Sequence, residues 1–189
     1  MKFYNINIDY LEFLHNIDNE VEYSSNYRTS SAEKVFLGII TDVNGQKYFI
    51  PLTSAKAKHT SDTLVSKNHM LIYETVSKDQ KEKFPDKFYK ATENENEFLL
   101  LISCLLFNKA IPVLDGQYHL LDIPNVEDSK YRSMLIKEYL FCRSMQDEIQ
   151  ERALSTIKAI KSGKRVRYAC NLNLLEEEMG KFEDWILWR

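Results

Sequence analysis

Glycine, cysteine and long hydrophobic runs are all scarce in this chain of 189 residues. Only five glycines occur, and neither a G-x-G-x-x-G nor a Walker A pattern is present, which argues against the nucleotide-binding enzymes that use those loops. Three cysteines, Cys104, Cys142 and Cys170, are too few and too widely spaced for a disulfide framework or a zinc ribbon. We therefore expect three buried thiols in a reducing compartment.

Metal ligands and membrane segments are equally poorly represented. The four histidines show neither an H-E-x-x-H motif nor a helical pair spacing, so we expect no metal and no cofactor. The first residues lack the apolar core of a signal peptide. The most apolar stretch, residues 98–107, is shorter than the roughly 20 residues that span a bilayer. These observations predict a soluble, cytoplasmic protein without a membrane partner.

The overall composition is that of an ordinary globular protein. Apolar residues make up 44% and charged residues 28%, and the formal net charge is −3. This length suits one domain, which we expect to cover residues 1–189. Because the chain is not basic overall, any nucleic-acid site has to be a local patch of positive charge.

The first half of the chain has the pattern of strands. Alternation predicts a strand over residues 2–8, followed by a short helix that Asp9 is expected to cap. Two apolar runs, residues 34–43 and 46–52, flank Asn44-Gly45, which is the strongest short signal for a β-hairpin.

Beyond the hairpin, the pattern changes from strands to helices. Strands are expected at residues 70–73, 98–106 and 117–121, with residues 74–97 as an exposed insertion. Residues 128–189 are predicted to be mainly helical. There, Asp128 or Ser129 caps a first helix, a second ends at Gly163, and a last runs over about residues 173–188. Strands first and helices later indicate an α+β fold around an antiparallel sheet.

A cluster of positive charge lies within the helical part. Between residues 152 and 167 there are six basic residues and no acidic one. They are Arg152, Lys158, Lys161, Lys164, Arg165 and Arg167. Such a cluster is either a solvated helix face or a patch that contacts phosphates, and composition does not distinguish the two.

The segment that follows the hairpin is the most unusual one. Thr53, Ser54, Lys56, Lys58 and His59 place two hydroxyls, two ammonium groups and an imidazole within seven residues. Cleaving RNA without a metal requires groups that position the phosphate, neutralise the developing charge and move protons, and these side chains supply such groups. The alternative interpretation is a polar surface loop with local turn hydrogen bonds.

Two further side chains are candidate partners of this segment. Tyr10 lies in the first predicted helix and Lys34 at the start of the second predicted strand. Periodicity alone gives each an ordinary role, Tyr10 as an amphipathic anchor at the core rim and Lys34 as a solvated strand end. Nothing in the spacing alone brings them to Ser54.

Several segments, taken in order, resemble the ToxN/AbiQ family, the protein toxins of type III toxin–antitoxin systems. The segments are residues 1–4 with Tyr10, 34–39, 47–56 with His59, 111–113, 120–122, 131–135 and 170–177. Each segment is short, but their order and spacing cover most of the chain. Residues 74–97 match least.

The resemblance implies a fold, an activity and a partner. The fold would be a strongly twisted antiparallel β-sheet partly wrapped by helices, similar to the cores of MazF/Kid-like toxins. The activity would be metal-independent, sequence-selective endoribonuclease cleavage that leaves a 2′,3′-cyclic phosphate and acts on cellular or phage RNA in abortive infection. A small repeat antitoxin RNA, which the toxin processes into pseudoknot units, would inhibit it, and the two would form a closed assembly.

The resemblance also implies site residues. Ser54 matches the serine that the family needs for activity, Thr53 matches its hydroxyl neighbour, and Lys56 matches the lysine of the same loop. Tyr10 and Lys34 match residues that line the cleft, and His59 falls where relatives can carry a histidine. The family commonly has proline between the serine and the lysine, and Ala55 stands there in this chain. Proline would stiffen this loop, so Ala55 leaves it freer.

These matches lead to one hypothesis and two alternatives. In the hypothesis, Lys34 and Lys56 stabilise the phosphorane, and Thr53 and Ser54 position the phosphate or the 2′-hydroxyl. Lys58, His59 and the basic cluster would bind the rest of the RNA. The first alternative is a non-catalytic module that binds structured RNA. The second is a protein-interaction role for the C-terminal helices, which carry Trp185 and Trp188.

Overall fold

The computed structural model describes residues 1–28, 34–42, 44–56 and 68–189. Within them, the strands form one eight-stranded antiparallel sheet with the order β4-β6-β3-β2-β1-β8, while β5 pairs with β6 and β7 with β3. The strands are β1 (Lys2–Ile6), β2 (Val35–Thr41), β3 (Lys47–Ser54), β4 (His69–Ser77), β5 (Tyr89–Ala91), β6 (Glu97–Leu106), β7 (Ile111–Pro112) and β8 (Tyr118–Leu120). This architecture confirms the predicted α+β class, and the likeness to MazF/Kid-like cores stays a prediction.

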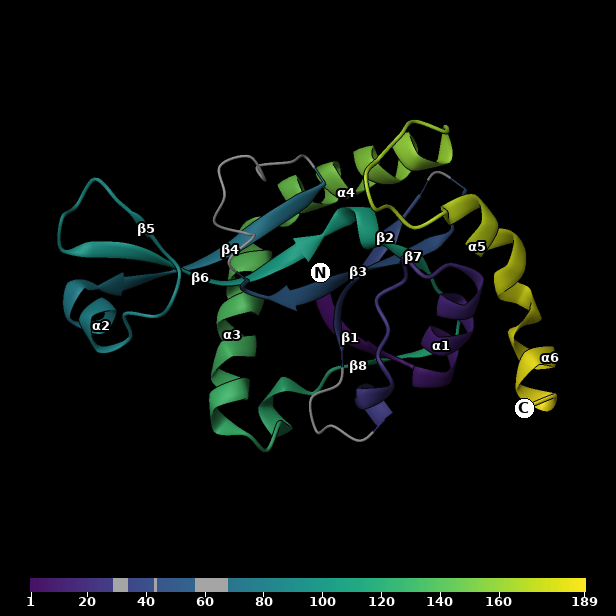
Figure 1. Ribbon diagram of the computed structural model, residues 1–189, viewed down its shortest axis with the longest axis horizontal. Coiled ribbons are helices and arrows are strands. Elements are labelled where there is room, and N and C mark those ends of the chain that lie inside the picture. Colours follow the sequence, from purple (N-terminus) through teal and green to yellow (C-terminus); the bar gives the residue numbers. More distant parts are fainter. Residues whose placement is uncertain (29–33, 43, 57–67) are drawn as a thin grey trace.

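Helices cover two parts of the sheet (Figure 1). They are α1 (Ile8–Ile17), α2 (Lys78–Lys83), α3 (Ser129–Ser144), α4 (Gln146–Lys161), α5 (Leu172–Glu178) and α6 (Phe182–Leu187). Short 3-10 segments lie at Ser25–Arg28, Phe107–Lys109, Ile123–Asn125 and Met179–Lys181. The long helices α3 and α4 pack against β4, β6 and β2, whereas α1, α5 and α6 pack together at the other end of the molecule.

The hairpin and most helix boundaries follow the sequence. The β2–β3 turn closes through the Asp42 amide, which donates to the Gln46 carbonyl at 3.0 Å, and Gly45 has a positive φ of 83°. The Asp128 side chain caps α3, and Gly163 follows α4 with a φ of 78°. The first helix differs from its prediction, because Asn7 and not Asp9 is the cap: Asn7 Oδ1 accepts from the Asp9 amide at 2.9 Å. The predicted last helix is divided into α5, a 3-10 turn and α6.

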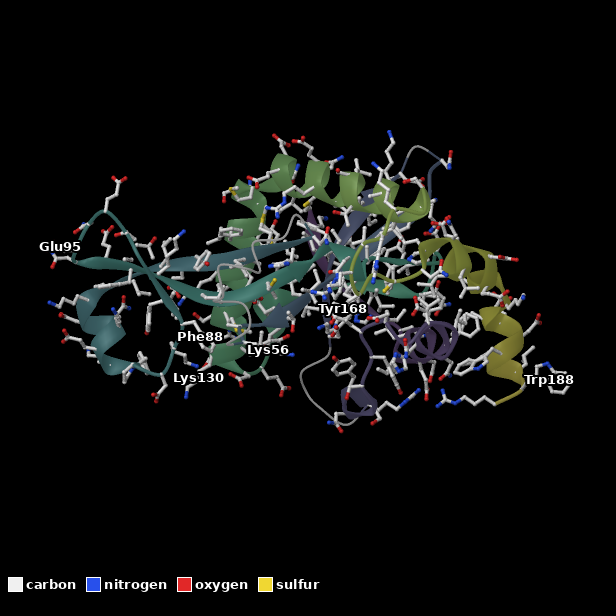
Figure 2. The ribbon with its side chains drawn as sticks, turned by 45° about the horizontal axis from the view of Figure 1, so that its top comes forward. Lys56, Phe88, Glu95, Lys130, Tyr168 and Trp188 are labelled. Carbon is white, nitrogen blue, oxygen red and sulfur yellow. The ribbon has the colours of Figure 1, made fainter. Side chains whose placement is uncertain are left out.

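Residues 74–97, predicted to be an exposed insertion, are largely exposed and form part of an arm with strands and a helix. We call residues 74–100 the arm: in it β4 runs on to Ser77, α2 and β5 follow, and the first half of β6 returns. It projects from one end of the molecule (Figure 1), with Glu95 near its tip (Figure 2). A capping box between Ser77 and Gln80 starts α2. Both faces of the arm are largely solvent-exposed, so its strands carry charged side chains on both faces. The alternation of apolar and polar residues that would predict a strand is therefore missing.

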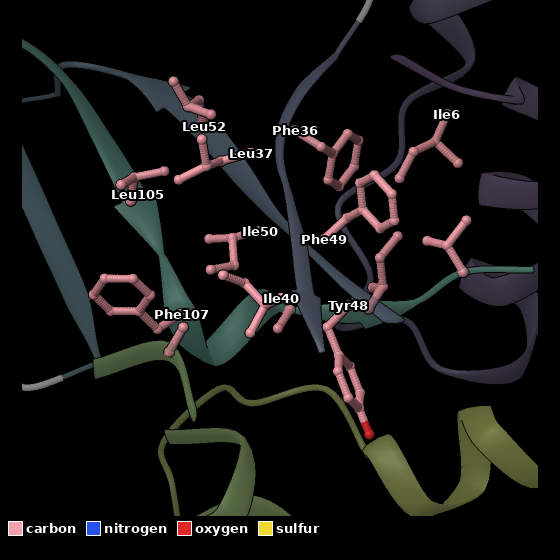
Figure 3. Close-up of a cluster of buried hydrophobic side chains, with 14 of the residues drawn as sticks. Ile6, Phe36, Leu37, Ile40, Tyr48, Phe49, Ile50, Leu52, Leu105 and Phe107 are labelled. Atoms are coloured by element: carbon pink, nitrogen blue, oxygen red, sulfur yellow. The ribbon is translucent and has the colours of Figure 1, made fainter. Parts of the chain in front are cut away.

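The core lies between the sheet and its helices (Figure 3). Phe36, Phe49 and Phe107 are each at most 1% exposed, and burying such a side chain contributes about 1.5–3 kcal/mol. Gly38 lies where the β2–β3 register shifts, and a Cβ there would be 2.6 Å from the Phe49 ring. All three cysteines are buried free thiols, as predicted. None of the described helices has the length and apolar character needed to cross a membrane.

Candidate active site

The two hydroxyls predicted in a loop lie instead in a strand. Thr53 and Ser54 are the last residues of β3, which extends two residues past its predicted end and pairs there with β6. Thr53 lies opposite Cys104 and Ser54 lies opposite Ser103. Residues that are directly opposite in an antiparallel pair share one face of the sheet, so the Ser54 and Ser103 side chains point the same way. The sheet therefore fixes the backbone that carries Ser54.

A pocket of about 290 Å³ opens at this end of β3. Its lining consists of Tyr27, Lys34, Val35, Leu52, Thr53, Ser54, Lys56, Tyr131, Met134 and Glu138. Four of the five side chains predicted to be catalytic are among them, from two separate places in the chain. The structure therefore brings Lys34, which the spacing alone did not connect to Ser54, into one pocket with Ser54 and Lys56.

Lys34 is the more buried of the two lysines. It immediately precedes β2, and its side chain is 9% exposed. Burial lowers its pKa, the carboxylate of Glu22 at 3.5 Å opposes this effect, and the positive charge of Lys56 lowers the pKa further. An ammonium group in such surroundings gives up its proton more readily than an exposed lysine, and its charge is felt more strongly in the pocket.

Glu138 is a member of the site that the sequence did not indicate. It lies in α3, is 3% exposed and lines the pocket. Burial raises the pKa of its carboxyl to about 7. The Ser103 hydroxyl lies close enough to offset part of this rise, although it forms no well-aligned hydrogen bond with any described residue. A carboxyl that titrates near neutral pH can act as an acid or as a base.

The helical spacing of the apolar residues around Glu138 could have indicated that this residue is buried. Tyr131, Leu135 and Cys142 repeat at intervals of four and seven residues, and Glu138 occupies the same face between them. A glutamate in the middle of an apolar stripe has to be buried, and buried carboxyls are uncommon unless they have a role.

Tyr27 forms another part of the pocket lining. It belongs to the 3-10 segment after α1, and the neighbouring Arg28 ties that segment to α1 through ion pairs with Asp9 at 2.6 Å and Glu12 at 2.5 Å. Burial raises the pKa of the Tyr27 hydroxyl, and the charge of Glu22 adds to the effect. Tyr27 therefore stays a neutral donor in the pocket near neutral pH.

The prediction that Tyr10 lines the cleft is wrong. Tyr10 is fully buried, packs edge-on against Phe182 and donates its hydroxyl to the Pro112 carbonyl at 3.2 Å. Pro112 pairs with Tyr48, six residues and about 20 Å along β3 from Ser54. The alternative interpretation of Tyr10 as an amphipathic anchor is therefore the better one, although the residue lies within the core and not at its rim.

The predicted basic cluster is divided in two. Arg152 donates to the His69 carbonyl at 2.6 Å and lies over the Phe107 ring, and Lys161 is paired with Asp42 at 3.0 Å and Glu176 at 2.8 Å. These two side chains stabilise the fold. The exposed members are Lys158, Lys164, Arg165 and Arg167. Lys58 and His59, predicted to bind RNA, lie outside the described residues.

Metal ligands do not gather anywhere in the described part of the chain: no group of three or more His, Cys, Asp and Glu side chains there could hold an ion. The chemically active groups of the pocket are instead ammonium, hydroxyl and carboxyl groups.

Known proteins share both the fold and the sequence pattern. The chain is 29% identical over 182 residues to an endoribonuclease ToxN from Pectobacterium atrosepticum, covering 96% of this chain and 94% of that protein. A structure solved in work on a processed non-coding RNA that regulates a bacterial antiviral system matches with a TM-score of 0.74 and 28% identity, covering 96% and 98%. A second, from work on selective toxin inhibition by a non-coding RNA pseudoknot, shares the fold with a TM-score of 0.69 and 21% identity, covering 97% and 98%.

The fold of this chain is thus that of structures solved in work on a bacterial antiviral system and on type III toxin–antitoxin systems, and in this chain a lysine- and hydroxyl-lined pocket opens at the end of β3. The family of toxin ToxN, of type III toxin–antitoxin systems, matches residues 2–180. The chain belongs to this family.

Proposed function

We propose that this protein is a metal-independent, sequence-selective endoribonuclease toxin that acts in the cytoplasm. The observation that carries the proposal is the convergence of Lys34, Thr53, Ser54 and Lys56 on one pocket in a chain of the ToxN family. The relative from Pectobacterium atrosepticum bears the name of such an enzyme, which supports this activity for a chain matching it over nearly its whole length.

The pocket supplies each group that RNA cleavage requires. Thr53 and Ser54 hydrogen-bond the scissile phosphate, and the ammonium groups of Lys34 and Lys56 neutralise the charge that develops on it. The Glu138 carboxylate takes the proton of the 2′-hydroxyl. The 2′-oxygen then forms a bond to phosphorus while the bond from phosphorus to the 5′-oxygen breaks.

The leaving 5′-oxygen takes a proton from Lys34. The products are a 2′,3′-cyclic phosphate and a 5′-hydroxyl, so the atoms and charges balance without an ion or a cofactor. The lowered pKa of Lys34 and a Glu138 pKa of about 7 both bring proton transfer closer to neutral pH.

The partner is a small antitoxin RNA. One structural relative comes from work on toxin inhibition by an RNA pseudoknot, and another from work on a processed RNA in an antiviral system. We propose that a repeat RNA of this kind inhibits the present chain, is processed by it into pseudoknot units, and assembles with it into a closed complex. Released toxin cleaves cellular or phage transcripts and so aborts infection.

The test compares the wild-type chain with Ser54→Ala. Each protein, freed of RNA, is incubated with a long transcript, with and without EDTA, and the new ends are mapped. Wild type should give discrete cuts with cyclic phosphate ends in both buffers, and Ser54→Ala should reduce cleavage at least 100-fold while its melting temperature and RNA affinity stay unchanged.

Three results would count against the proposal. Full cleavage by Ser54→Ala removes that residue from the mechanism. Loss of cleavage in EDTA indicates a metal enzyme. Tight binding of RNA by wild type with every transcript left whole indicates a non-catalytic RNA-binding module, which the exposed cations of residues 158–167 would equally suit.

A further inference from the structure

The loop between α4 and α5 presents a tyrosine in an uncommon backbone conformation. Residues 166–169 form a turn in which the Ala169 amide donates to the Val166 carbonyl at 3.4 Å. Tyr168 is the third residue of this turn and has a φ of +54°, the only positive φ of a non-glycine residue in the described chain. A positive φ at this position is normally taken by glycine or asparagine, because a Cβ makes it unfavourable.

Packing of the fold does not explain why a tyrosine stands there. The residue is 65% exposed. A buried aromatic ring can offset a strained backbone through apolar burial, but an exposed one gains little. Strained, exposed residues of this kind occur preferentially at binding sites.

The surrounding structure holds the strained turn in place. The side-chain amide of Asn108 donates to the carbonyls of both Arg167 and Tyr168 at 3.1 Å, and the Asn108 carbonyl accepts from the Cys170 amide at 3.0 Å. The Arg167 guanidinium lies 5.6 Å from the centre of the Tyr168 ring. The backbone at Tyr168 is therefore held by Asn108, and a cation lies beside the ring.

The loop that carries the Tyr168 ring is rich in positive charge. Arg167 precedes Tyr168, and Lys164 and Arg165, both exposed, lie in the same loop. An aromatic ring set among cations is the arrangement that binds single-stranded nucleic acid: bases stack on the ring while the cations contact phosphates.

We propose that Tyr168 is a stacking platform for an unpaired base of the RNA that enters the Ser54 pocket. The identity of the partner as RNA rests on the proposed function. Asn108 follows Ser103 by five residues, so at most roughly 18 Å separate the anchor of the loop from the strand opposite Ser54. The backbone positions of Asn108 and Ser103 are therefore within the span of a short RNA strand.

The experiment uses two variants of Tyr168 in the full-length Ser54→Ala chain, so that bound RNA stays intact. Tyr168→Asn tolerates the left-handed backbone but removes the ring, and Tyr168→Phe keeps the ring. Affinity is measured for two probes, a random pool of 20-nucleotide single-stranded RNAs and a fully paired RNA duplex of 20 base pairs, at several salt concentrations.

Tyr168→Asn should weaken binding of the single-stranded pool about tenfold, which is the lower range for loss of one base–aromatic stack. Binding of the duplex should stay within about twofold, because its bases are already stacked, and the salt dependence should not change, because no charge is lost. Tyr168→Phe should bind both probes like the parent. The melting temperature of Tyr168→Asn should equal or exceed that of the parent, since asparagine relieves the strain.

Several outcomes would overturn the proposal. Unchanged affinity of Tyr168→Asn for the pool, an equal loss for the duplex, or an equal loss in Tyr168→Phe would each exclude stacking. A lower melting temperature in Tyr168→Asn would indicate a structural role instead. Cleavage by the wild-type chain is measured separately, so a failure of the proposed activity is distinguishable from a failure at Tyr168.

Discussion

The two ends of β3 carry the same kinds of side chain in opposite arrangements. At its beginning, the Tyr48 hydroxyl points toward α5 (Figure 3) and contacts Lys161 at 2.9 Å and the carboxylate of Glu176. Lys161 is also paired with Asp42. At the other end, about 20 Å away, lie Lys34, Lys56, two hydroxyls and Glu138.

The pKa shifts of the two lysines express this contrast. Burial opposes the charge of Lys161, but its hydrogen bonds to Glu176, Tyr48 and Asp42 outweigh that effect and raise its pKa. Burial lowers the pKa of Lys34, and the neighbouring Lys56 adds to this effect. A lysine bound by two carboxylates and a hydroxyl stabilises a fold, whereas a buried lysine with one carboxylate at 3.5 Å and a second lysine nearby keeps positive charge for an incoming anion.

Replacing Lys34 should have the largest effect at the end of β3 that carries Ser54. Lys34→Met should reduce RNA cleavage about 10²–10³-fold, because the phosphorane loses a preorganised charge. The free energy of unfolding should stay equal or rise, since burying the ammonium is unfavourable. Initial cleavage rates and urea denaturation measure both. Lys47→Met, at the opposite end of the strand and paired with Asp115 at 2.5 Å, is the matched control and should cleave normally. Retention of more than a tenth of the activity by Lys34→Met would contradict the catalytic role proposed for Lys34.

Glu138 predicts a pH dependence of stability. Its pKa is about 7 in the fold and 4.5 in the unfolded chain, so between these values the folded state holds more protons. Its contribution to stability is thus full below pH 4.5 and is lost as the pH rises to about 7, a loss of about 3 kcal/mol.

Glu138→Gln removes this titration. The variant should be more stable than wild type at pH 8, and the difference should shrink towards pH 5, as followed by urea denaturation at both pH values. Its cleavage should fall at every pH. An equal difference in stability at pH 5 and pH 8 would show that the Glu138 carboxyl does not titrate in this range.

Replacing Lys161 tests the other end of β3, where this lysine is paired with carboxylates. Lys161→Met leaves Asp42 and Glu176 without their cation and should cost about 2 kcal/mol of unfolding free energy, which is less than for a fully buried pair. Cleavage and RNA affinity of the folded protein should not change. Lys164→Met, which is exposed in the neighbouring loop, should show the reverse pattern of weaker RNA binding and unchanged stability. Weaker RNA binding by Lys161→Met would restore the original hypothesis of a continuous basic patch.

The smallest effect concerns a single hydroxyl. Tyr48→Phe should cost about 1 kcal/mol, because Glu176 and Lys161 lose a partially buried hydrogen-bond partner. Tyr10→Phe loses one longer hydrogen bond and should cost less, and neither variant should change the cleavage rate. Thermal denaturation and cleavage assays suffice, and slower cleavage by Tyr10→Phe would return that residue to the active site.

The sequence predicted what depends on local pattern. The hairpin at Asn44-Gly45, the Asp128 cap and the end of α4 shortly before Gly163 each follow from residues within one or two turns of the chain. The segment after the hairpin was singled out because its hydroxyl and ammonium groups are close in sequence, and Thr53, Ser54 and Lys56 line the pocket. Its secondary structure was wrong at Thr53 and Ser54, since polar residues at a strand end look like a loop.

What the sequence could not predict depends on contacts between distant residues. Lys161 lies 119 residues from Asp42, so a run of positive charge gave no sign of its carboxylate partners. Tyr10 satisfies a helical apolar pattern and a family match equally well, and only the fold shows that it faces Phe182. The strain at Tyr168 is a property of the backbone, which composition does not report.

The placement of Ser54 within β3 has a further consequence. The Ala55 amide donates to the Ile102 carbonyl at 3.3 Å, so the chain on either side of the hydroxyl is fastened to the neighbouring strand. Amide hydrogens here should exchange with solvent slowly, as they do in a sheet interior. An inhibitor is therefore not expected to displace the backbone at Ser54. It has to inhibit the protein by occupying the space in front of that residue.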